Sequence, residues 1–126
     1  MLFIKNNNVT DPGMNLALEE YCIRNLDPAN DYVILYINEP SVIIGKHQNL
    51  FRECNYTYLQ MKGIHIVRRI SGGGAVFHDH GNLNFSFITG FQKEKLAYLN
   101  KLIQPVVAAL HQLSAPAELS KNNNID

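Results

Sequence analysis

Three consecutive glycines, Gly72–Gly74, separate two extended apolar runs and restrict the possible folds more than any other feature of the sequence. Glycine loses more backbone entropy on folding than any other residue, so three in a row between strands are costly. The usual compensation is a ligand that approaches the bare backbone, because successive N–H groups make a cavity suited to phosphate or carboxylate. The run is neither the nucleotide P-loop nor the Rossmann fingerprint. It predicts a loop between two strands and a candidate anion site.

Two arginines, Arg68 and Arg69, come shortly before the glycines. A guanidinium group binds phosphate in a forked geometry, which supports the anion site. Adjacent residues on a strand face opposite sides, so we expect only one of the two arginines to reach the site. The alternative is a flexible hairpin whose arginines are simply solvated, because glycine is common in turns of every kind.

The rest of the chain predicts alternating strands and helices. Runs of β-branched and aromatic residues predict strands at 2–5, 32–37, 41–44, 64–70, 75–78 and 83–88. The runs 32–37 and 41–44, on either side of Asn38-Glu39-Pro40, are interpreted as a strand pair. Helices are expected from Asp11-Pro12 to Asp27-Pro28, from Asn55 to Met61 with Gly63 closing it, and from Glu94 to Leu113, where Pro105 should kink or divide the helix. This order of elements indicates an α/β or α+β domain with a sheet covered by helices.

Composition narrows the class of protein. The 126 residues suffice for one core, and 11 basic and 11 acidic residues cancel, which gives no support to binding of nucleic acid or of a membrane surface. No apolar run approaches the roughly 18–20 residues of a membrane span, and Met1–Lys5 lacks the pattern of a signal peptide. Two cysteines, Cys22 and Cys54, fit free thiols in a reducing compartment. We therefore expect a cytoplasmic protein.

Four blocks of sequence resemble the lipoate–protein ligase A family, in the family's order and spacing. The first is Asp11-Pro12-Gly13-Met14-Asn15-Leu16-Ala17-Leu18-Glu19-Glu20. The second comprises Val42-Ile43-Ile44-Gly45-Lys46-His47-Gln48-Asn49 and Arg52-Glu53-Cys54-Asn55. The third runs from Arg68 to Asp79 and continues as Gly81-Asn82-Leu83-Asn84-Phe85-Ser86-Phe87, and the fourth is Ser114-Ala115-Pro116-Ala117-Glu118. Together they span nearly the whole chain.

This resemblance implies an α+β fold, a catalytic domain with a central mixed sheet flanked by helices that is shared with biotin ligases. It also implies a reaction in two steps. Lipoate and ATP, accompanied by Mg²⁺, give lipoyl-adenylate and pyrophosphate. The lipoyl group then passes to a lysine of an acceptor. The implied acceptors are the lipoyl domains of 2-oxoacid dehydrogenase complexes and the glycine-cleavage H protein.

The resemblance also implies roles for individual residues. Arg69 is expected to contact the phosphate as the catalytic cation. The implied ATP or lipoyl-adenylate site comprises Arg69, Ser71, Gly72, Gly73, Gly74, Ala75, Val76, Phe77, His78 and Asn82. Gly45, Gln48 and Asn49 are expected to shape the lipoate pocket, although a plain turn explains them nearly as well. A metal site at His78 and His80 is disfavoured, because zinc needs further ligands.

The sequence departs from the family pattern near its end. Ser120–Asp126 stands where the family has Gly-Arg-Asn-Asp, so that Asn124 replaces the aspartate and Asp126 is the nearest acid. The family lysine of the following Lys-Ile/Val-Ser-Gly block is not present, and Lys121 is out of register with it. On this basis residues 1–126 are expected to be the N-terminal part of the catalytic domain, without its remainder and accessory domain, and inactive alone.

Two rival functions stay open. One is an octanoyl or lipoyl transferase of the same fold, which uses a cysteine nucleophile and no ATP. We interpret Cys22 and Cys54 as buried structural thiols instead, because free cysteine is among the most buried residue types. The other rival is a truncated, non-catalytic paralogue that binds nucleotide or a lipoyl domain.

Overall fold

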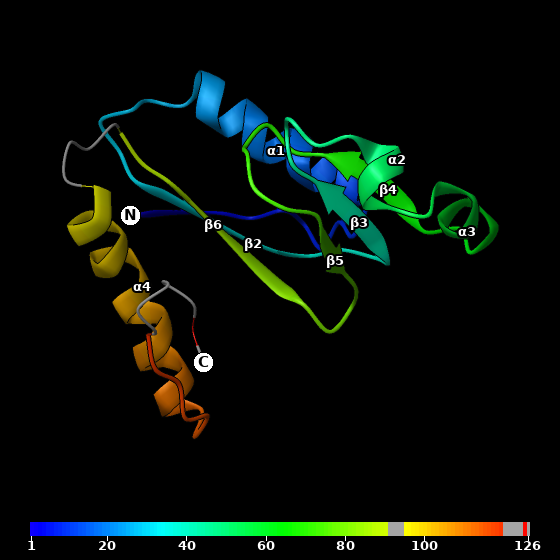
Figure 1. Ribbon diagram of the computed structural model, residues 1–126. Helices are drawn as coiled ribbons and strands as arrows, with labels where there is room; N and C mark the ends of the chain where they lie inside the picture. The colour runs from blue at the N-terminus through cyan, green and yellow to red at the C-terminus, as the bar shows by residue number, and fades with distance from the viewer. Residues whose placement is uncertain (91–94, 120–124, 126) are drawn as a thin grey trace. The chain divides into compact units, whose positions relative to one another are not determined.

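The computed structural model describes residues 1–90, 95–119 and 125, with residues 95–99 described by their backbone only. The chain divides into two compact units, Met1–Thr89 and Gly90–Asp126. Figure 1 shows the elements. They are β1 (Leu2–Ile4), α1 (Pro12–Asn25), β2 (Tyr32–Ile37), β3 (Ser41–Ile44), α2 (Leu50–Glu53), α3 (Tyr56–Met61), β4 (His65–Arg68), β5 (Val76–His78), β6 (Leu83–Ile88) and α4 (Lys95–Gln112). The mixed strands and helices confirm the predicted α+β class.

The six strands of the first unit form two three-stranded sheets. One has the order β1-β2-β6, with β1 parallel and β6 antiparallel to β2. The other has the order β4-β3-β5, with β4 parallel and β5 antiparallel to β3. Helix α1 contacts β4 of one sheet and β6 of the other (Figure 1), so it bridges the two sheets.

The predicted pairing of strands 32–37 and 41–44 is wrong, because β2 and β3 belong to different sheets. The reason lies in the connection between them. Asn38 is fully buried and accepts a hydrogen bond from Asn15 of α1, and the N–H of Glu39 donates to the carbonyl of Thr10 (2.9 Å). These contacts hold the connection against α1. A hairpin turn would instead have kept the two strands side by side.

Local signals placed α1 and α3 correctly. The side chain of Asp11 accepts from the N–H of Met14 (2.7 Å), and Pro12 occupies the first helical turn. Asn55 caps α3 in the same way, and Gly63 follows with a φ of 64°. The sequence interpretation missed α2, whose cap is Asn49. It also made the strand at 64–70 too long, since β4 ends at Arg68.

The core of the first unit lies between α1 and the β1-β2-β6 sheet. Its buried members are Cys22, Ile34 and Tyr36, and the side chains packed against them are Ile4, Leu18, Leu26 and Ile88. Alternation along β2 buries Tyr32, Ile34 and Tyr36 and leaves Leu35 and Ile37 exposed, as a half-buried strand requires.

That alternation gives a paired test of stability. We expect Ile34→Ala to lower the free energy of unfolding by about 2–5 kcal/mol, since it leaves a cavity in the core. The control is Leu35→Ala, at a neighbouring position 39% exposed, which should cost about 1 kcal/mol or less. Urea denaturation followed by circular dichroism measures both values. Equal losses in the two variants would contradict the assignment of Ile34 to the core.

The second unit is built on α4. The helix runs through Pro105 as one element, so the proline does not divide it in two. Ile103, Val107 and Ala117 are buried, with Leu110, Leu119 and Ile125 packed against them. The predicted start at Glu94 lies outside the described residues, as do the side chains of Leu96 and Leu99 in the predicted apolar stripe.

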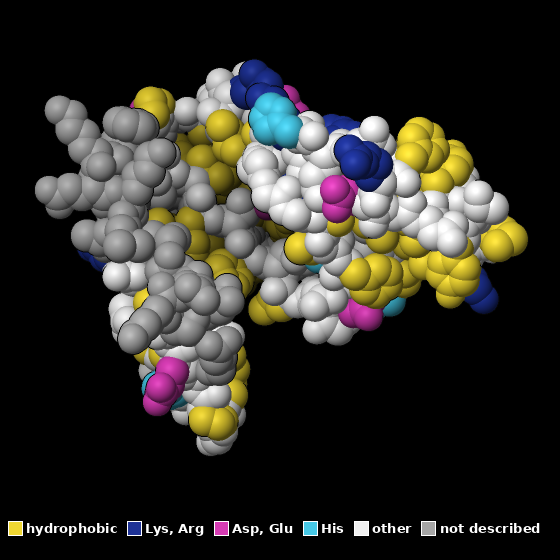
Figure 2. Space-filling model, viewed as in Figure 1, with side chains coloured by type: hydrophobic (Ala, Val, Ile, Leu, Met, Phe, Trp, Pro, Cys, Tyr) yellow, Lys and Arg dark blue, Asp and Glu magenta, His cyan; other side chains and the backbone are white. Residues whose placement is uncertain are grey.

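Surface features add little to the functional argument. In the described part of the chain, no helix has both the length and the apolar character needed to cross a membrane. Figure 2 shows hydrophobic side chains gathered at the end of the first unit that carries α2 and α3. Phe51, Tyr56, Tyr58 and Met61 of those helices are all exposed.

Candidate functional site

The glycine loop crosses the end of a strand. Residues 69–75 connect β4 to β5, which lie on opposite sides of β3. Two backbone hydrogen bonds hold the crossing in place. The N–H of Arg69 donates to the carbonyl of Ile44 (3.0 Å), and the N–H of Lys46 donates to the carbonyl of Ser71 (2.8 Å). The predicted loop between two strands is therefore confirmed, and it passes over the carboxyl end of β3.

The side chain of Arg69 holds this loop through its carbonyl groups. Nη2 donates to the carbonyls of Gly72 (2.7 Å) and Gly74 (2.8 Å), and Nε also donates to Gly72 (3.1 Å). Nη1 donates to the carbonyl of Ile43 in β3 (3.3 Å). A planar guanidinium with five donors suits this arrangement, whereas a lysine could not reach all three carbonyls in a fixed geometry.

The carbonyl groups of Ser71, Gly72 and Gly74 thus accept hydrogen bonds, whereas the N–H groups of the loop have no partner in the described structure. Among the residues that the structure describes, the N–H groups of Ser71, Gly72, Gly73 and Gly74 have no hydrogen-bond acceptor. All four residues are exposed. Exposed N–H donors beside a guanidinium charge attract anions, and phosphate or carboxylate oxygens would satisfy them.

Close packing requires glycine at two positions. Gly73 has a φ of 98°, which side-chain-bearing residues rarely adopt, and a Cβ atom there would lie 2.7 Å from Nη2 of Arg69. A Cβ atom on Gly45 would overlap the carbonyl oxygen of Gly73. A Cβ atom on Gly72 or Gly74 would meet open space. The loop therefore depends sterically on Gly45 and Gly73, while the bare backbone at the other two positions is available to a ligand.

Arg68 stabilises the neighbouring turn after β3. Its Nη1 donates to the carbonyls of Gly45 (2.9 Å), Lys46 (3.3 Å) and Gln48 (2.8 Å). Both arginines also line the cavity between α1 and the segment 67–71. The side chain of Arg69 contacts the glycine loop and that of Arg68 contacts the turn after β3. The expectation that only one arginine reaches the anion site stays a prediction.

A cavity of about 320 Å³ lies beside the loop. Helix α1 forms one wall and the segment 67–71 forms the other. Its lining residues are Gly13, Leu16, Ala17, Glu19, Glu20, Ile23, Val67, Arg68, Arg69, Ile70, Ser71 and Ser86. Most of the α1 wall is apolar, whereas the opposite wall includes two arginine residues. Such a cavity suits a molecule with an apolar body and an anionic end.

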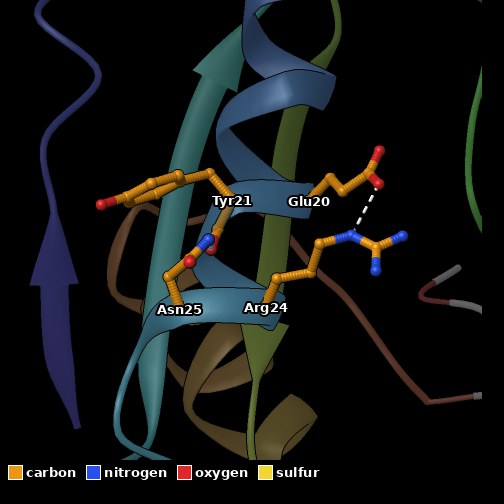
Figure 3. Close-up of polar contacts among 4 residues, drawn as sticks. All are labelled: Glu20, Tyr21, Arg24 and Asn25. Carbon is orange, nitrogen blue, oxygen red and sulfur yellow. Dashed lines mark hydrogen bonds and ion pairs between the residues drawn. The ribbon is translucent and has the colours of Figure 1, made fainter.

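The two acids on the α1 wall are each engaged with another side chain. Oε1 of Glu19 accepts a hydrogen bond from the hydroxyl of Tyr36 (2.8 Å). Burial, followed by the nearby Glu19 carboxylate, raises the pKa of Tyr36 far above its usual range. Glu20 pairs with Nε of Arg24 one turn later (2.7 Å), and Figure 3 shows both side chains on one side of α1, with Tyr21 on the other.

His78 lies on β5, opposite Ser41 of β3. Its Nδ1 is 3.0 Å from Nδ2 of Asn38. Burial of the ring lowers the pKa of His78 below its ordinary value, and the Arg69 charge lowers it further. The imidazole is therefore held in its neutral form at neutral pH.

The other predicted ligand residues have local contacts. Ala75, Val76 and Phe77 are exposed as the chain enters β5. Oδ1 of Asn82 accepts from the N–H of Asp79 (3.0 Å), which closes the turn before β6. Their contacts with a nucleotide stay predictions.

The predicted lipoate-pocket residues lie in the turn after β3 and not among the lining of the 320 Å³ cavity. Oε1 of Gln48 accepts from the N–H of Gly45 (2.8 Å), and Asn49 caps α2. Of these three residues, Gly45 packs against the carbonyl of Gly73 in the glycine loop. The apolar wall that sequence reasoning missed belongs to α1, where Leu16, Ala17 and Ile23 carry no motif-like signal.

Several further predictions concern metals, the tail and the thiols. No group of three or more His, Cys, Asp or Glu side chains in the described segments could hold a metal ion. Lys121, Asn124 and Asp126 lie outside the described residues. Cys22 and Cys54 are free, as predicted. Cys22 is buried, with burial and Glu19 raising its pKa, but Cys54 is half-buried at the end of α2, so its prediction as a buried thiol is only partly right.

The fold and the site together define an α+β domain in which a glycine loop, held by Arg69, lies beside a cavity with one largely apolar wall. The sequence profile of the lipoyl protein ligase A/B catalytic domain matches residues 11–125, and the chain belongs to this family. Similar proteins include a lipoate–protein ligase of Bacillus subtilis (54% identical over 99% of the chain) and lipoate–protein ligase 1 of Staphylococcus aureus (52%, 99%). The chain spans 38% of the length of each of them.

Solved structures agree with this assignment. A putative lipoate protein ligase of Thermoplasma acidophilum with bound lipoic acid superposes with a TM-score of 0.81 at 29% identity, covering 99% of this chain and 52% of its own. A lipoate–protein ligase A bound with ATP gives the same TM-score and identity, covering 99% and 50%.

Proposed function

We propose that this chain forms the substrate-binding part of a ligase that activates lipoate with ATP and attaches the lipoyl group to a protein lysine. One observation carries the proposal: the free N–H groups of Ser71–Gly74, backed by Arg69, open beside a cavity with one apolar wall. The relatives are named lipoate–protein ligases, and solved relatives hold lipoic acid or ATP. These similarities support the same substrates here.

In this proposal the two walls of the cavity bind different parts of lipoate. The aliphatic chain and dithiolane ring of lipoate lie against Leu16, Ala17 and Ile23, which bury apolar surface. The carboxylate points to the arginine wall. The nucleotide phosphates lie on the glycine loop and along 74–77, with His78 and Asn82 further along its path.

The first step joins lipoate to the nucleotide. A carboxylate oxygen attacks the α-phosphorus of ATP, the bond to the β-phosphate breaks, and pyrophosphate leaves. The Arg69 charge and the loop's N–H donors stabilise the negative charge that accumulates on the α-phosphate oxygens. In the second step a lysine amine attacks the acyl carbon, AMP leaves, and the amine loses a proton as the amide forms.

In this proposal Mg²⁺ accompanies ATP. The side chains and N–H groups of the site indicate how the ion would be held. No cluster of acids among the described residues could hold the ion by itself, whereas the loop's donors suit phosphate. Mg²⁺ usually keeps several waters and relies on substrate phosphates. The chain's own part is therefore to fix the phosphates to which the ion binds.

The proposed acceptors are lipoyl domains of 2-oxoacid dehydrogenase complexes and the glycine-cleavage H protein. One solved relative is described as a bipartite lipoate protein ligase together with its E2 lipoyl domain from Thermoplasma acidophilum. We also propose a cytoplasmic location, which the two free thiols support.

A chimera tests the function. Residues 1–126 replace the corresponding segment of the Bacillus subtilis ligase, which is feasible at 54% identity. We expect lipoate-dependent exchange of pyrophosphate into ATP, and lipoylated acceptor detected by mass spectrometry. Acyl transfer from a carrier protein without ATP would instead support the transferase. Nucleotide binding with no exchange would support the non-catalytic paralogue.

A further inference from the structure

A chain of asparagine side chains runs from the start of α1 to His78. Asn6, Asn15 and Asn38 come from three separate segments, and Asn15 and Asn38 are 1% and 0% exposed. Burial of two primary amides is costly unless their donors and acceptors are satisfied. Here they satisfy one another in sequence, and the last amide reaches the imidazole of His78.

A backbone carbonyl fixes the direction of every hydrogen bond in this series of asparagine side chains. The carbonyl of Val9 can only accept, so the atom of Asn15 that lies 3.0 Å away is its NH₂ group. The same NH₂ group donates to Oδ1 of Asn38 (2.9 Å). Asn38 therefore turns its own NH₂ group toward His78. The order is independent of any assumption about the histidine.

The tautomer of His78 follows from that order. A ring nitrogen facing an NH₂ donor must accept, so Nδ1 carries no proton and the proton of the neutral ring is on Nε2. The two nitrogens lie on opposite sides of the ring, so Nε2–H points away from Asn38. It has no acceptor among the described residues. His78 pairs across the strands with Ser41 of β3. Ser41 comes two residues before Ile43, whose carbonyl accepts from Arg69.

We infer that Asn15 and Asn38 are positioning residues that hold His78 in a single neutral tautomer, as an uncharged Nε2–H donor for an oxygen of the bound nucleotide. The inference deepens the proposed function and rests on it for the identity of the ligand. An uncharged donor suits this place, because Arg69 already supplies the positive charge. Protonation at Nδ1 would set two donors, the ring and the Asn38 amide, against each other.

Other charged groups near His78 do not supply an alternative partner for Nδ1. On β4, His65 pairs with Ser41 in the same row, and Glu39 lies 3.8 Å from the Nε2 atom of His65. Arg69 follows β4 and disfavours the imidazolium form. On its own segment His78 is followed by Asp79 and His80. The amide of Asn38 is the group in hydrogen-bond contact with the ring.

Nuclear magnetic resonance of the ring nitrogens tests this in the 126-residue chain. We expect the neutral His78 to show a protonated Nε2 and a bare Nδ1, with a pKa below the ordinary value for histidine. In Asn38→Asp a carboxylate faces Nδ1 and favours its protonation, so the pKa of His78 should rise by about 1–3 units. The control is Asn55→Asp, which adds the same charge at the exposed cap of α3.

A proton on Nδ1 in the unmodified chain, or an unchanged His78 pKa in a folded Asn38→Asp, would overturn the inference. If Asn38→Asp does not fold, Asn15→Ser frees the Asn38 amide to rotate, and both tautomers should then appear. A single Nε2–H tautomer in that variant would equally overturn it.

The donor role has its own readout in the chimera. The acid limb of the pH–rate profile for pyrophosphate exchange should move upward in Asn38→Asp by the same amount as the His78 pKa. An unmoved limb would overturn the donor role. If the unmodified chimera shows no pyrophosphate exchange, that result counts against the proposed function. The tautomer of His78 is measured in the 126-residue chain without nucleotide, so it tests the positioning role of Asn15 and Asn38 separately.

Discussion

Replacing Gly73 by valine in the chimera is expected to lower lipoate-dependent pyrophosphate exchange by about 100- to 1000-fold, the usual effect of losing a preorganised charge-stabilising donor. The physical cause is local. The backbone at Gly73 has a φ of 98°, and a new Cβ atom would lie 2.7 Å from Nη2 of Arg69. The side chain of Arg69 must then leave the loop's carbonyls, and the row of N–H donors loses its shape.

Gly63→Val is the matched control for this prediction. Gly63 also has a positive φ, 64°, but a Cβ atom there meets open space and the residue lies after α3, away from the loop. Each substitution should cost about 1–3 kcal/mol of stability through backbone strain. Thermal denaturation checks that cost, and exchange kinetics separate the two variants. Similar rates of pyrophosphate exchange in the two variants would show that the glycine loop is not part of the catalytic site.

Arg69→Lys is expected to reduce exchange about 100-fold although it preserves the charge. The ammonium group cannot replace the guanidinium contacts to Gly72, Gly74 and Ile43 together. We therefore expect the loop to lose order as well, which faster hydrogen exchange at the N–H groups of residues 71–74 would report.

The control for this second prediction is Arg52→Lys, at an exposed position in the last turn of α2. It should leave both the rate and the amide exchange of the loop unchanged. Full activity in Arg69→Lys would mean that the charge of residue 69 matters and the clamp does not.

Local signals in the sequence were sufficient for most element boundaries. Asp11 and Asn55 carry the capping side chains of α1 and α3, and the alternation of Tyr32–Ile37 marks a strand with one buried face. Pairing was less accessible. The separation of β2 and β3 into two sheets depends on Asn38, whose burial comes from contacts with a helix 23 residues away in sequence. No local pattern around Asn38 contains that information.

The candidate site shows the same division. The order of the residues, three glycines shortly after two arginines, was enough to predict a candidate anion-binding loop. The manner in which Arg69 acts could not be read from the sequence, because a guanidinium that could bind phosphate directly is here bonded to the loop's carbonyls. The α1 wall was missed for another reason. Leu16, Ala17 and Ile23 look like ordinary helix residues until the fold places α1 against the segment 67–71.

Because the loop passes over β3, the proposed binding of substrate is linked to the stability of the β4-β3-β5 sheet. The loop begins at one edge strand and ends at the other, and neighbouring strands lie about 4.8 Å apart, so it spans two such spacings. The two ends of the loop keep their spacing only while β4 and β5 both keep their register with β3. A slip of either edge strand by one residue would spread the donors apart. Under the proposed function, a substrate bound to the loop ties the three strands together, and its binding free energy opposes fraying of both edge strands at once.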